Sequence, residues 1–156
     1  MKKKILFVCT GNSCRSPMAE ALFNRAAEKD GRTVLEASSA GTAAPQGAAP
    51  PFEAIQTMAK IKIDMSGHRA QQIEREMIRC AHLILVMEKQ HMRYVRELSQ
   101  EDGGKVFLLT GFGRSGEGEE IPDPIGRNMA FYEVVLKQLY TEIQRILPLL
   151  NRPGGH

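Results

Sequence analysis

Two short apolar runs constrain the fold of this chain more than any other feature of its sequence. Residues 4–8 and 82–87 are apolar throughout after their first residue, without the polar alternation of a strand that has one face in water. Such runs are typical of strands covered on both faces in a parallel sheet. Weaker strand signals lie at residues 33–37 and 105–109. Because segments with helical spacing separate the four, we expect one three-layer α/β domain whose four-stranded parallel sheet is flanked by helices.

The segments between these runs carry apolar residues at the three- and four-residue spacing of helices. Helices are expected at residues 18–29, from Phe52 onward, and at 69–81, 88–98 and 128–147. Their inward faces are expected to carry Phe52, Ile55, Met58 and Ala59, then Ile73, Met77 and Ile78, and finally Phe131, Val135, Leu139, Ile143 and Ile146. Residues 38–51 and 111–124 are expected to be loops. The 156 residues suit one domain, residues 1–150, with a frayed tail at 151–156.

Charge and cysteine content argue against several classes of function. The 21 Lys and Arg residues and the 18 Asp and Glu residues are spread along the chain, and the net charge of +3 provides no basic arm for nucleic acid. The apolar run after the first lysines is too short for an export signal, and no run reaches the roughly 18 residues of a membrane span. Three cysteines and four histidines show no zinc-ligand spacing. We expect a cytoplasmic monomer, with at most weak self-association, that needs no metal or cofactor.

The loop after the first apolar run has the composition of a phosphate-binding site. Residues 8–17 read VCTGNSCRSP, which places a cysteine, five residues and then Arg-Ser between a predicted strand and a predicted helix. Backbone N–H groups of such a loop and the positive end of the helix converge on an oxyanion, and the same field stabilises a thiolate at Cys9. Arg15 has the planar fork that holds two phosphate oxygens. The other residues expected around the phosphate are Thr10, Gly11, Asn12, Ser13, Cys14 and Ser16.

Three of these loop residues have a specific local part to play. Gly11 lets the chain turn tightly, and Asn12 is among the few residues that tolerate a left-handed backbone. Ser16 can donate its hydroxyl group to the thiolate and later to the leaving sulfur. The segment is not a nucleotide-binding loop of the Gly-Lys-Ser/Thr type, because no such triplet follows it.

Residues 8–20, VCTGNSCRSPMAE, closely resemble the signature of the low molecular weight protein tyrosine phosphatases, and the resemblance extends through most of the chain. It implies that Ser39 braces Asn12 and that His68 supports the same network. It also implies that Asp123, in the sequence Ile-Pro-Asp-Pro, is the general acid. Apart from the resemblance, a carboxyl group in a loop held by two prolines can deliver a proton to a leaving group.

The implied reaction has two steps and requires phosphorylated proteins as partners. The thiolate of Cys9 attacks phosphorus while Asp123 protonates the leaving group, and water deprotonated by Asp123 then hydrolyses the phosphocysteine. Cys14 has two open interpretations, which are packing at the helix start and a thiol that traps oxidised Cys9 as a reversible disulfide. Cys80 is assigned to the core.

The expected substrate is phosphotyrosine, with phosphoarginine in proteins as the alternative. Tyrosine-directed members of the family generally place one aromatic residue after the Asp-Pro pair and another in the loop after the second strand. This chain has Ile125 at the first position and no aromatic residue within residues 42–46. Members directed at phosphoarginine carry a small hydroxyl residue, typically threonine, where others often have isoleucine, and this chain has Ser13 there. These differences keep the alternative open.

Two further functions compete with hydrolysis. Thioredoxin-coupled arsenate reductases share the fold and a nearly identical loop, but their chemistry passes through two further cysteines separated by a short spacing. Cys80 lies in a plausible region, yet position 87 is Met87 and no second cysteine follows. The other competitor is a module that binds phosphate without turnover. The intact set of Cys9, Arg15 and Asp123 argues against it.

Overall fold

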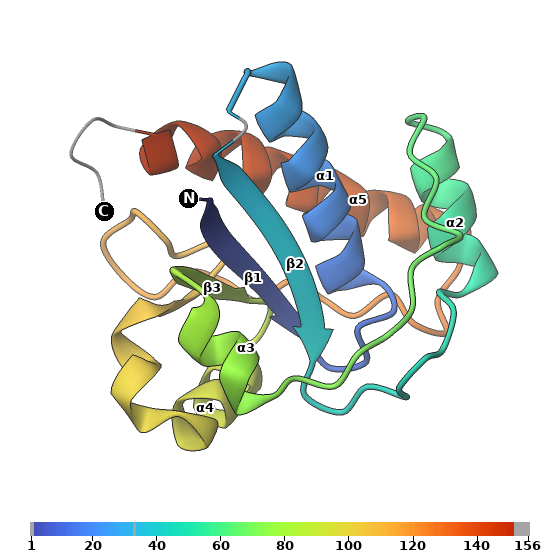
Figure 1. Cartoon of the computed structure of the whole chain (residues 1–156). Coiled ribbons are helices and arrows are strands. Elements are labelled where there is room, and N and C mark those ends of the chain that lie inside the picture. Colours follow the sequence, from blue (N-terminus) through green and yellow to red (C-terminus); the bar gives the residue numbers. More distant parts are fainter. Residues whose placement is uncertain (1, 33, 152–156) are drawn as a thin grey trace.

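The computed structural model describes residues 2–32 and 34–151. Its sheet contains β1 (Lys3–Cys9), β2 (Leu35–Gly41), β3 (Leu83–Val86) and β4 (Val106–Leu108), all parallel and in the order β2-β1-β3-β4. The expected four-stranded parallel sheet is therefore confirmed, with β1 in its interior (Figure 1). Thr33, expected to begin the second strand, and residues 152–156 of the expected tail lie outside the described residues.

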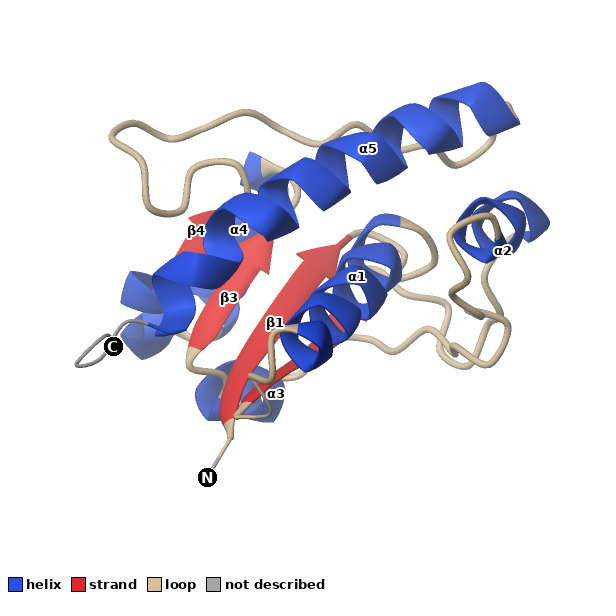
Figure 2. Cartoon of the chain, turned by 90° about the horizontal axis from the view of Figure 1, so that it is seen from above, coloured by secondary structure: helices blue, strands red, loops and turns tan. Residues whose placement is uncertain are grey.

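Helices cover both faces of this sheet and make the three layers. One layer contains α1 (Arg15–Lys29), α2 (Phe52–Ala59) and α5 (Met129–Ile146), and the other contains α3 (Arg75–Cys80) and α4 (Lys89–Leu98) (Figure 1). Helices α1 and α5 pack against each other on the same face of the sheet (Figure 2). Two short 3-10 helices, η1 (Gln100–Lys105) and η2 (Leu147–Asn151), follow α4 and α5.

Strand β1 divides the apolar core between the two layers. Ile5 and Phe7 belong to the cluster under α1 and α5, whereas Leu6 and Val8 belong to the cluster under α3 and α4. All four are buried, because successive side chains of a strand point to opposite faces and helices cover both. The ring of Phe7 meets that of Phe23 in α1 edge to face, at 5.9 Å between centroids. The doubly covered strand expected from the apolar run is thus present.

Two of the predicted boundaries are wrong, namely the start of the helix expected at residues 69–81 and the end of the second strand. The helix predicted for residues 69–81 spans only Arg75–Cys80, because the residues before it run alongside the end of β2. There the backbone of Gly41 donates to the carbonyl of Gln71 and accepts from the N–H of Ile73. Pairing with β1 also carries β2 on to Gly41, past the predicted end at residue 37.

Several residues predicted to face inward do not. Phe52 is 68% exposed and Ala59 is exposed, so α2 buries instead a narrow stripe toward α5 that contains Ala54, Thr57 and Met58. This i, i+3, i+4 stripe is sufficient for a helix that packs mainly on another helix. Cys80 is also exposed, so its assignment to the core is wrong. It is the last residue of α3, whose inward position is taken by Ile78.

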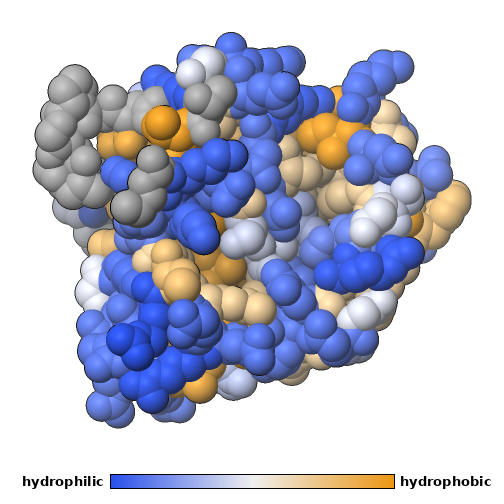
Figure 3. All heavy atoms as spheres, in the orientation of Figure 1, coloured by the Kyte–Doolittle hydropathy of each residue, from blue (hydrophilic) through white to orange (hydrophobic). Residues whose placement is uncertain are grey.

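The face of the molecule seen in Figure 3 carries isolated rather than continuous apolar areas. In the orientation of Figure 1, most of the visible face is hydrophilic, with separate orange and pale patches between blue ones (Figure 3). Within residues 2–32 and 34–151, no helix is both long and apolar enough to cross a bilayer.

Gly41 ends β2 directly behind the loop that follows β1, and we predict that it cannot be replaced by alanine without loss. A Cβ atom there would lie 2.4 Å from the carbonyl oxygen of Thr10 and 2.9 Å from the backbone nitrogen of Asn12. Gly41→Ala must displace that backbone, so we expect it to lower the free energy of unfolding in urea by about 1–3 kcal/mol. Gly67→Ala, whose Cβ would meet nothing within 4 Å, is the control. Equal losses in the two variants would contradict the steric argument.

Candidate active site

The loop between β1 and α1 forms a cavity at the C-terminal edge of the sheet. Cys9 ends β1 and Arg15 begins α1. A cavity of about 180 Å³ is lined by Cys9, Thr10, Gly11, Ser13, Cys14, Arg15, Asp123 and Ile125. The structure therefore brings together the three residues predicted to carry the chemistry, although Asp123 comes from a distant loop. The cavity is smaller than the roughly 300–1,000 Å³ of typical ligand pockets, which suits a phosphoryl group with the rest of its substrate outside.

The sulfur of Cys9 has a hydroxyl donor beside it. Cys9 Sγ is buried and lies 2.9 Å from Ser16 Oγ. Asn12 Nδ2 donates to the same Ser16 oxygen at 2.8 Å. Because the amide nitrogen can only donate, the hydrogen of Ser16 is left for Cys9 or for the carbonyl of Ala40, which is more distant at 3.5 Å. A hydroxyl that donates to sulfur at the N-terminus of α1 stabilises the thiolate.

Asn12 holds the loop in its shape. Its φ of 52° lies in the left-handed region, which asparagine tolerates better than most residues. Its side chain donates to Ser39 Oγ at 3.0 Å and accepts the backbone N–H of Gln71 at 2.9 Å. Its carbonyl accepts from His68 Nε2 at 2.8 Å. The contacts expected of Ser39 and His68 are thus present, whereas the sequence analysis missed the contact of Gln71.

The Asn12 network ends on a carboxyl group that the sequence analysis also missed. Ser39 Oγ accepts from Asn12 and donates to Glu20 Oε1 at 2.5 Å. Burial raises the pKa of Glu20 above its ordinary value. Glu20 lies within the sequence stretch that carries the resemblance, but no local feature of α1 shows that its side chain turns toward β2.

Arg15 is held on two sides by other groups of the protein. Its guanidinium is 2% exposed, and its Nη1 donates to Glu88 Oε2 at 2.5 Å and to the carbonyl of Ile121 at 2.7 Å. Its Nη2 lies 3.6 Å from Asp123 Oδ2. Although burial acts to raise the pKa of Glu88, hydrogen bonds from Arg15 and Gln90 hold it below its ordinary value, so the carboxylate is ionised. The guanidinium is therefore pre-oriented toward the cavity.

The loop that carries Asp123 is attached to the sheet near the cavity. The N–H of Ile121 donates to the carbonyl of Met87 at 2.9 Å, just beyond the end of β3. Asp123 Oδ1 accepts the N–H of Ile125 at 3.0 Å, and the carboxyl group is 42% exposed. Asp123 is thus placed at the rim of the cavity, where it can reach both a bound group and solvent.

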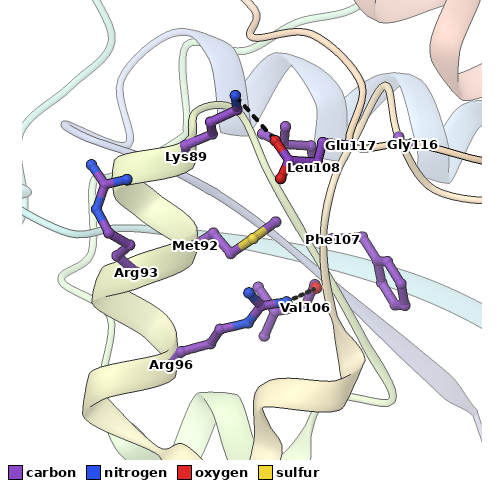
Figure 4. A pocket seen from close by; sticks show the side chains of 10 residues that line it. Lys89, Met92, Arg93, Arg96, Val106, Phe107, Leu108, Gly116 and Glu117 are labelled. Carbon is purple, nitrogen blue, oxygen red and sulfur yellow. Dashed lines mark hydrogen bonds and ion pairs between the residues drawn. The ribbon is translucent and has the colours of Figure 1, made fainter.

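The preceding part of that loop is fastened to α4. Lys89 forms an ion pair with Glu117 at 3.1 Å, and its backbone N–H donates to Glu120 Oε2 at 2.8 Å. Figure 4 shows Lys89 and Glu117 meeting at the rim of a hollow of about 340 Å³ between α4 and β4, into which Met92 points. In the described part of the chain, no residue of the Cys9 loop lines this hollow, so it is separate from the candidate active site.

Cys14 is a neutral thiol in this environment. It is buried, its Sγ lies 3.6 Å from Tyr132 Oη, and burial raises its pKa to about 11. Since the thiolate is the reactive form, this environment favours the packing interpretation of Cys14 over that of a thiol that traps oxidised Cys9 as a disulfide.

The start of α4 supplies two more residues that the sequence analysis missed, Glu88 and His91. His91 is buried, and its Nε2 lies 2.8 Å from Thr10 Oγ1. Burial, followed by the charge of Arg15, lowers the pKa of His91 to about 4. A signal was available in principle, because both residues follow the second apolar run, and the C-terminal ends of parallel strands meet at one edge of the sheet.

Comparison with known proteins shows that this chain is similar to phosphatases. Residues 4–154 match the family described as low molecular weight phosphotyrosine protein phosphatase. The chain is 38% identical over 145 residues to the low molecular weight protein-tyrosine-phosphatase Wzb of Escherichia coli, covering 93% of this chain and 90% of that protein. It is 35% identical over 148 residues to a protein-arginine-phosphatase of Bacillus subtilis, with 95% and 94% covered.

A solved structure shows the same architecture with a phosphorylated site. It is a mutant of the YwlE arginine phosphatase whose active-site serine is phosphorylated. The TM-score is 0.90 at 30% identity, and 96% of each chain is covered.

We predict that Asn12 is needed both for its backbone and for its side chain. Asn12→Ala removes the three side-chain hydrogen bonds to Ser16, Ser39 and Gln71 and puts alanine at a φ of 52°. Asn12→Gly loses the same bonds without the backbone penalty. We expect both variants to have a lower free energy of unfolding in urea than wild type, and the value for the alanine variant to be lower than that for the glycine variant by about 1 kcal/mol. Equal stability of the two variants would show that the left-handed backbone is not limiting.

Proposed function

The chain belongs to the low molecular weight phosphotyrosine protein phosphatase family, and we propose that it hydrolyses phosphotyrosine in proteins through a phosphocysteine at Cys9. Membership makes it a cysteine-dependent phosphatase. The observation that carries the residue assignment is the single cavity where the sulfur of Cys9, the guanidinium of Arg15 and the carboxyl group of Asp123 meet.

In the first step the Cys9 thiolate attacks phosphorus. The sulfur–phosphorus bond forms as the bond to the leaving oxygen breaks, and Asp123 gives that oxygen its proton. Arg15 and the loop N–H groups bind the equatorial oxygens, whose charge is spread in the transition state. The ion pair of Arg15 with Glu88 keeps the guanidinium in place without a rearrangement on binding.

In the second step water attacks the phosphocysteine. Asp123, now a carboxylate, accepts a proton from the water, and the sulfur–phosphorus bond breaks to release inorganic phosphate. The departing sulfur receives the hydrogen bond of Ser16, which is already directed toward it by Asn12. The enzyme returns to its starting state with the thiolate restored.

Two substitutions test these roles. Cys9→Ser should abolish turnover, because an unactivated hydroxyl is a far weaker nucleophile than a thiolate. Asp123→Asn should lower kcat/KM, which reports the first step and not the later hydrolysis of the phosphocysteine, by about 10²–10⁴ on phosphotyrosine peptides, and by less on para-nitrophenyl phosphate, whose leaving group hardly needs a proton. Asp30→Asn, at the exposed C-terminal end of α1, is the control. Equal losses on both substrates would rule out Asp123 as the proton donor.

Phosphoarginine is the second candidate substrate, and the composition of the cavity favours keeping it. Among the described residues that line the cavity, none is aromatic, and its side walls include Ser13 and Ile125, which is 51% exposed. A guanidinium needs no aromatic clamp and can donate to a serine hydroxyl. The relative named protein-arginine-phosphatase adds to this argument.

We predict that Ser13 controls the preference between the two substrates. Steady-state kcat/KM would be measured on phosphotyrosine and phosphoarginine peptides for wild type, Ser13→Thr and Ser13→Ile. Isoleucine should shift the ratio toward phosphotyrosine by about tenfold, because it removes a hydrogen-bond acceptor and adds apolar surface. Threonine retains the hydroxyl and should leave the ratio near that of wild type. An unchanged ratio in Ser13→Ile would refute the role of this position.

A further inference from the structure

The residue after the nucleophile contacts the start of α4 through a buried histidine. Thr10 Oγ1 lies 2.8 Å from His91 Nε2. On the other side of the ring, His91 Nδ1 accepts the backbone N–H of Glu88 at 3.0 Å. His91 is only 1% exposed. The ring therefore joins the first turn of α4 to the beginning of the phosphate loop.

These contacts determine which ring nitrogen carries the hydrogen. A neutral imidazole has one donor and one acceptor. Because Nδ1 accepts an amide hydrogen, the ring hydrogen is on Nε2 of His91, and Thr10 Oγ1 accepts it. The hydroxyl hydrogen of Thr10 is then free to be donated elsewhere, and Thr10 lines the cavity beside Cys9.

Charged groups from three segments surround the ring and favour its neutral form. Arg15 comes from α1, Glu88 from the start of α4, and Glu120 and Asp123 from the loop after β4. Burial, with the charge of Arg15 next, lowers the pKa of His91 to about 4, and the three carboxylates only partly oppose this. The tautomer that the hydrogen bonds require is therefore present around neutral pH.

We propose that His91 is a positioning residue that directs the hydroxyl hydrogen of Thr10 into the phosphate-binding cavity. The inference rests on the proposed phosphatase function and adds one donor for an oxygen of the phosphoryl group. Glu88 and His91 form the N-terminal capping box of α4, and Glu88 also holds Arg15. A single turn of α4 thus supports both ends of the phosphate loop.

A double-mutant cycle tests the pairing of Thr10 with His91. The readouts are kcat/KM on para-nitrophenyl phosphate and competitive inhibition by inorganic phosphate. We expect Thr10→Val and His91→Leu each to weaken both by about three- to tenfold, and the double variant to be no worse than the more affected single variant, because the first removes the Thr10 hydroxyl and the second removes the N–H that directs it. Thr10→Ser keeps the hydroxyl and should stay within about twofold of wild type. Additive losses, or unchanged phosphate inhibition, would overturn the proposal.

His82→Leu is the matched control. Nδ1 of His82 also accepts a backbone N–H, from Lys4 at 2.9 Å, but it does so at the opposite edge of the sheet. We expect this variant to leave phosphate inhibition unchanged. A loss equal to that of His91→Leu would assign the effect to general stability and defeat the proposal.

A spectroscopic measurement covers the case in which the His91 variants do not fold. In ¹⁵N NMR of the wild-type protein, His91 should carry its hydrogen on Nε2 alone between about pH 5 and pH 8. A hydrogen on Nδ1, or a charged ring in this range, would contradict the geometry.

Wild-type turnover separates this inference from the function itself. An inactive wild-type protein, or an active Cys9→Ser variant, would refute the proposed function. An active wild-type protein in which the effects of Thr10 and His91 are independent would refute only the positioning role of His91.

Discussion

The geometry of the site depends on the hydrogen bonds made by the side-chain amide of Asn12. This amide lies at the centre of the loop with two donated bonds and one accepted bond, and these link α1, β2 and the extended segment before α3. Because both amide hydrogens are donated, the hydroxyl hydrogens of Ser16 and Ser39 are left for other acceptors. These are Cys9 Sγ, or the more distant carbonyl of Ala40, for Ser16, and Glu20 for Ser39. Asn12 thus leaves Ser16 able to donate to the sulfur of Cys9.

Electrostatic balance explains the arrangement around Arg15. A buried guanidinium is costly unless its charge and its N–H groups are satisfied. Glu88 and the carbonyl of Ile121 satisfy one nitrogen, while the more exposed Asp123 stands 3.6 Å from another. The closer partner of Arg15, Glu88, thus lies at the start of α4, and the more distant partner, Asp123, lines the cavity. A phosphoryl group can therefore engage the guanidinium without breaking the contact that orients it.

The three cysteines occupy different environments. Cys9 has a hydroxyl donor at the N-terminus of a helix, whereas Cys14 is buried beside Tyr132 with a pKa raised to about 11. Cys80 is exposed at the end of α3 with Glu76 at 3.3 Å. An arsenate reductase would need a second thiol close to Cys80, and the sequence has only these three cysteines. The disposition of the thiols therefore fits hydrolysis through Cys9.

The class of fold and the chemistry of the loop can be predicted from the amino-acid sequence alone. Short uninterrupted apolar runs are typical of strands covered on both faces, and the Cys-x5-Arg spacing acts within one strand–loop–helix unit, so both predictions follow from neighbouring residues. The three-dimensional structure was needed to show that residues 71–73 run along Gly41, that Cys80 is exposed, and that Glu88 and His91 hold the loop. Glu88 is 73 residues from Arg15, and His91 is 81 residues from Thr10. Such contacts depend on which strand ends are adjacent in the sheet, and local periodicity carries no information about that adjacency.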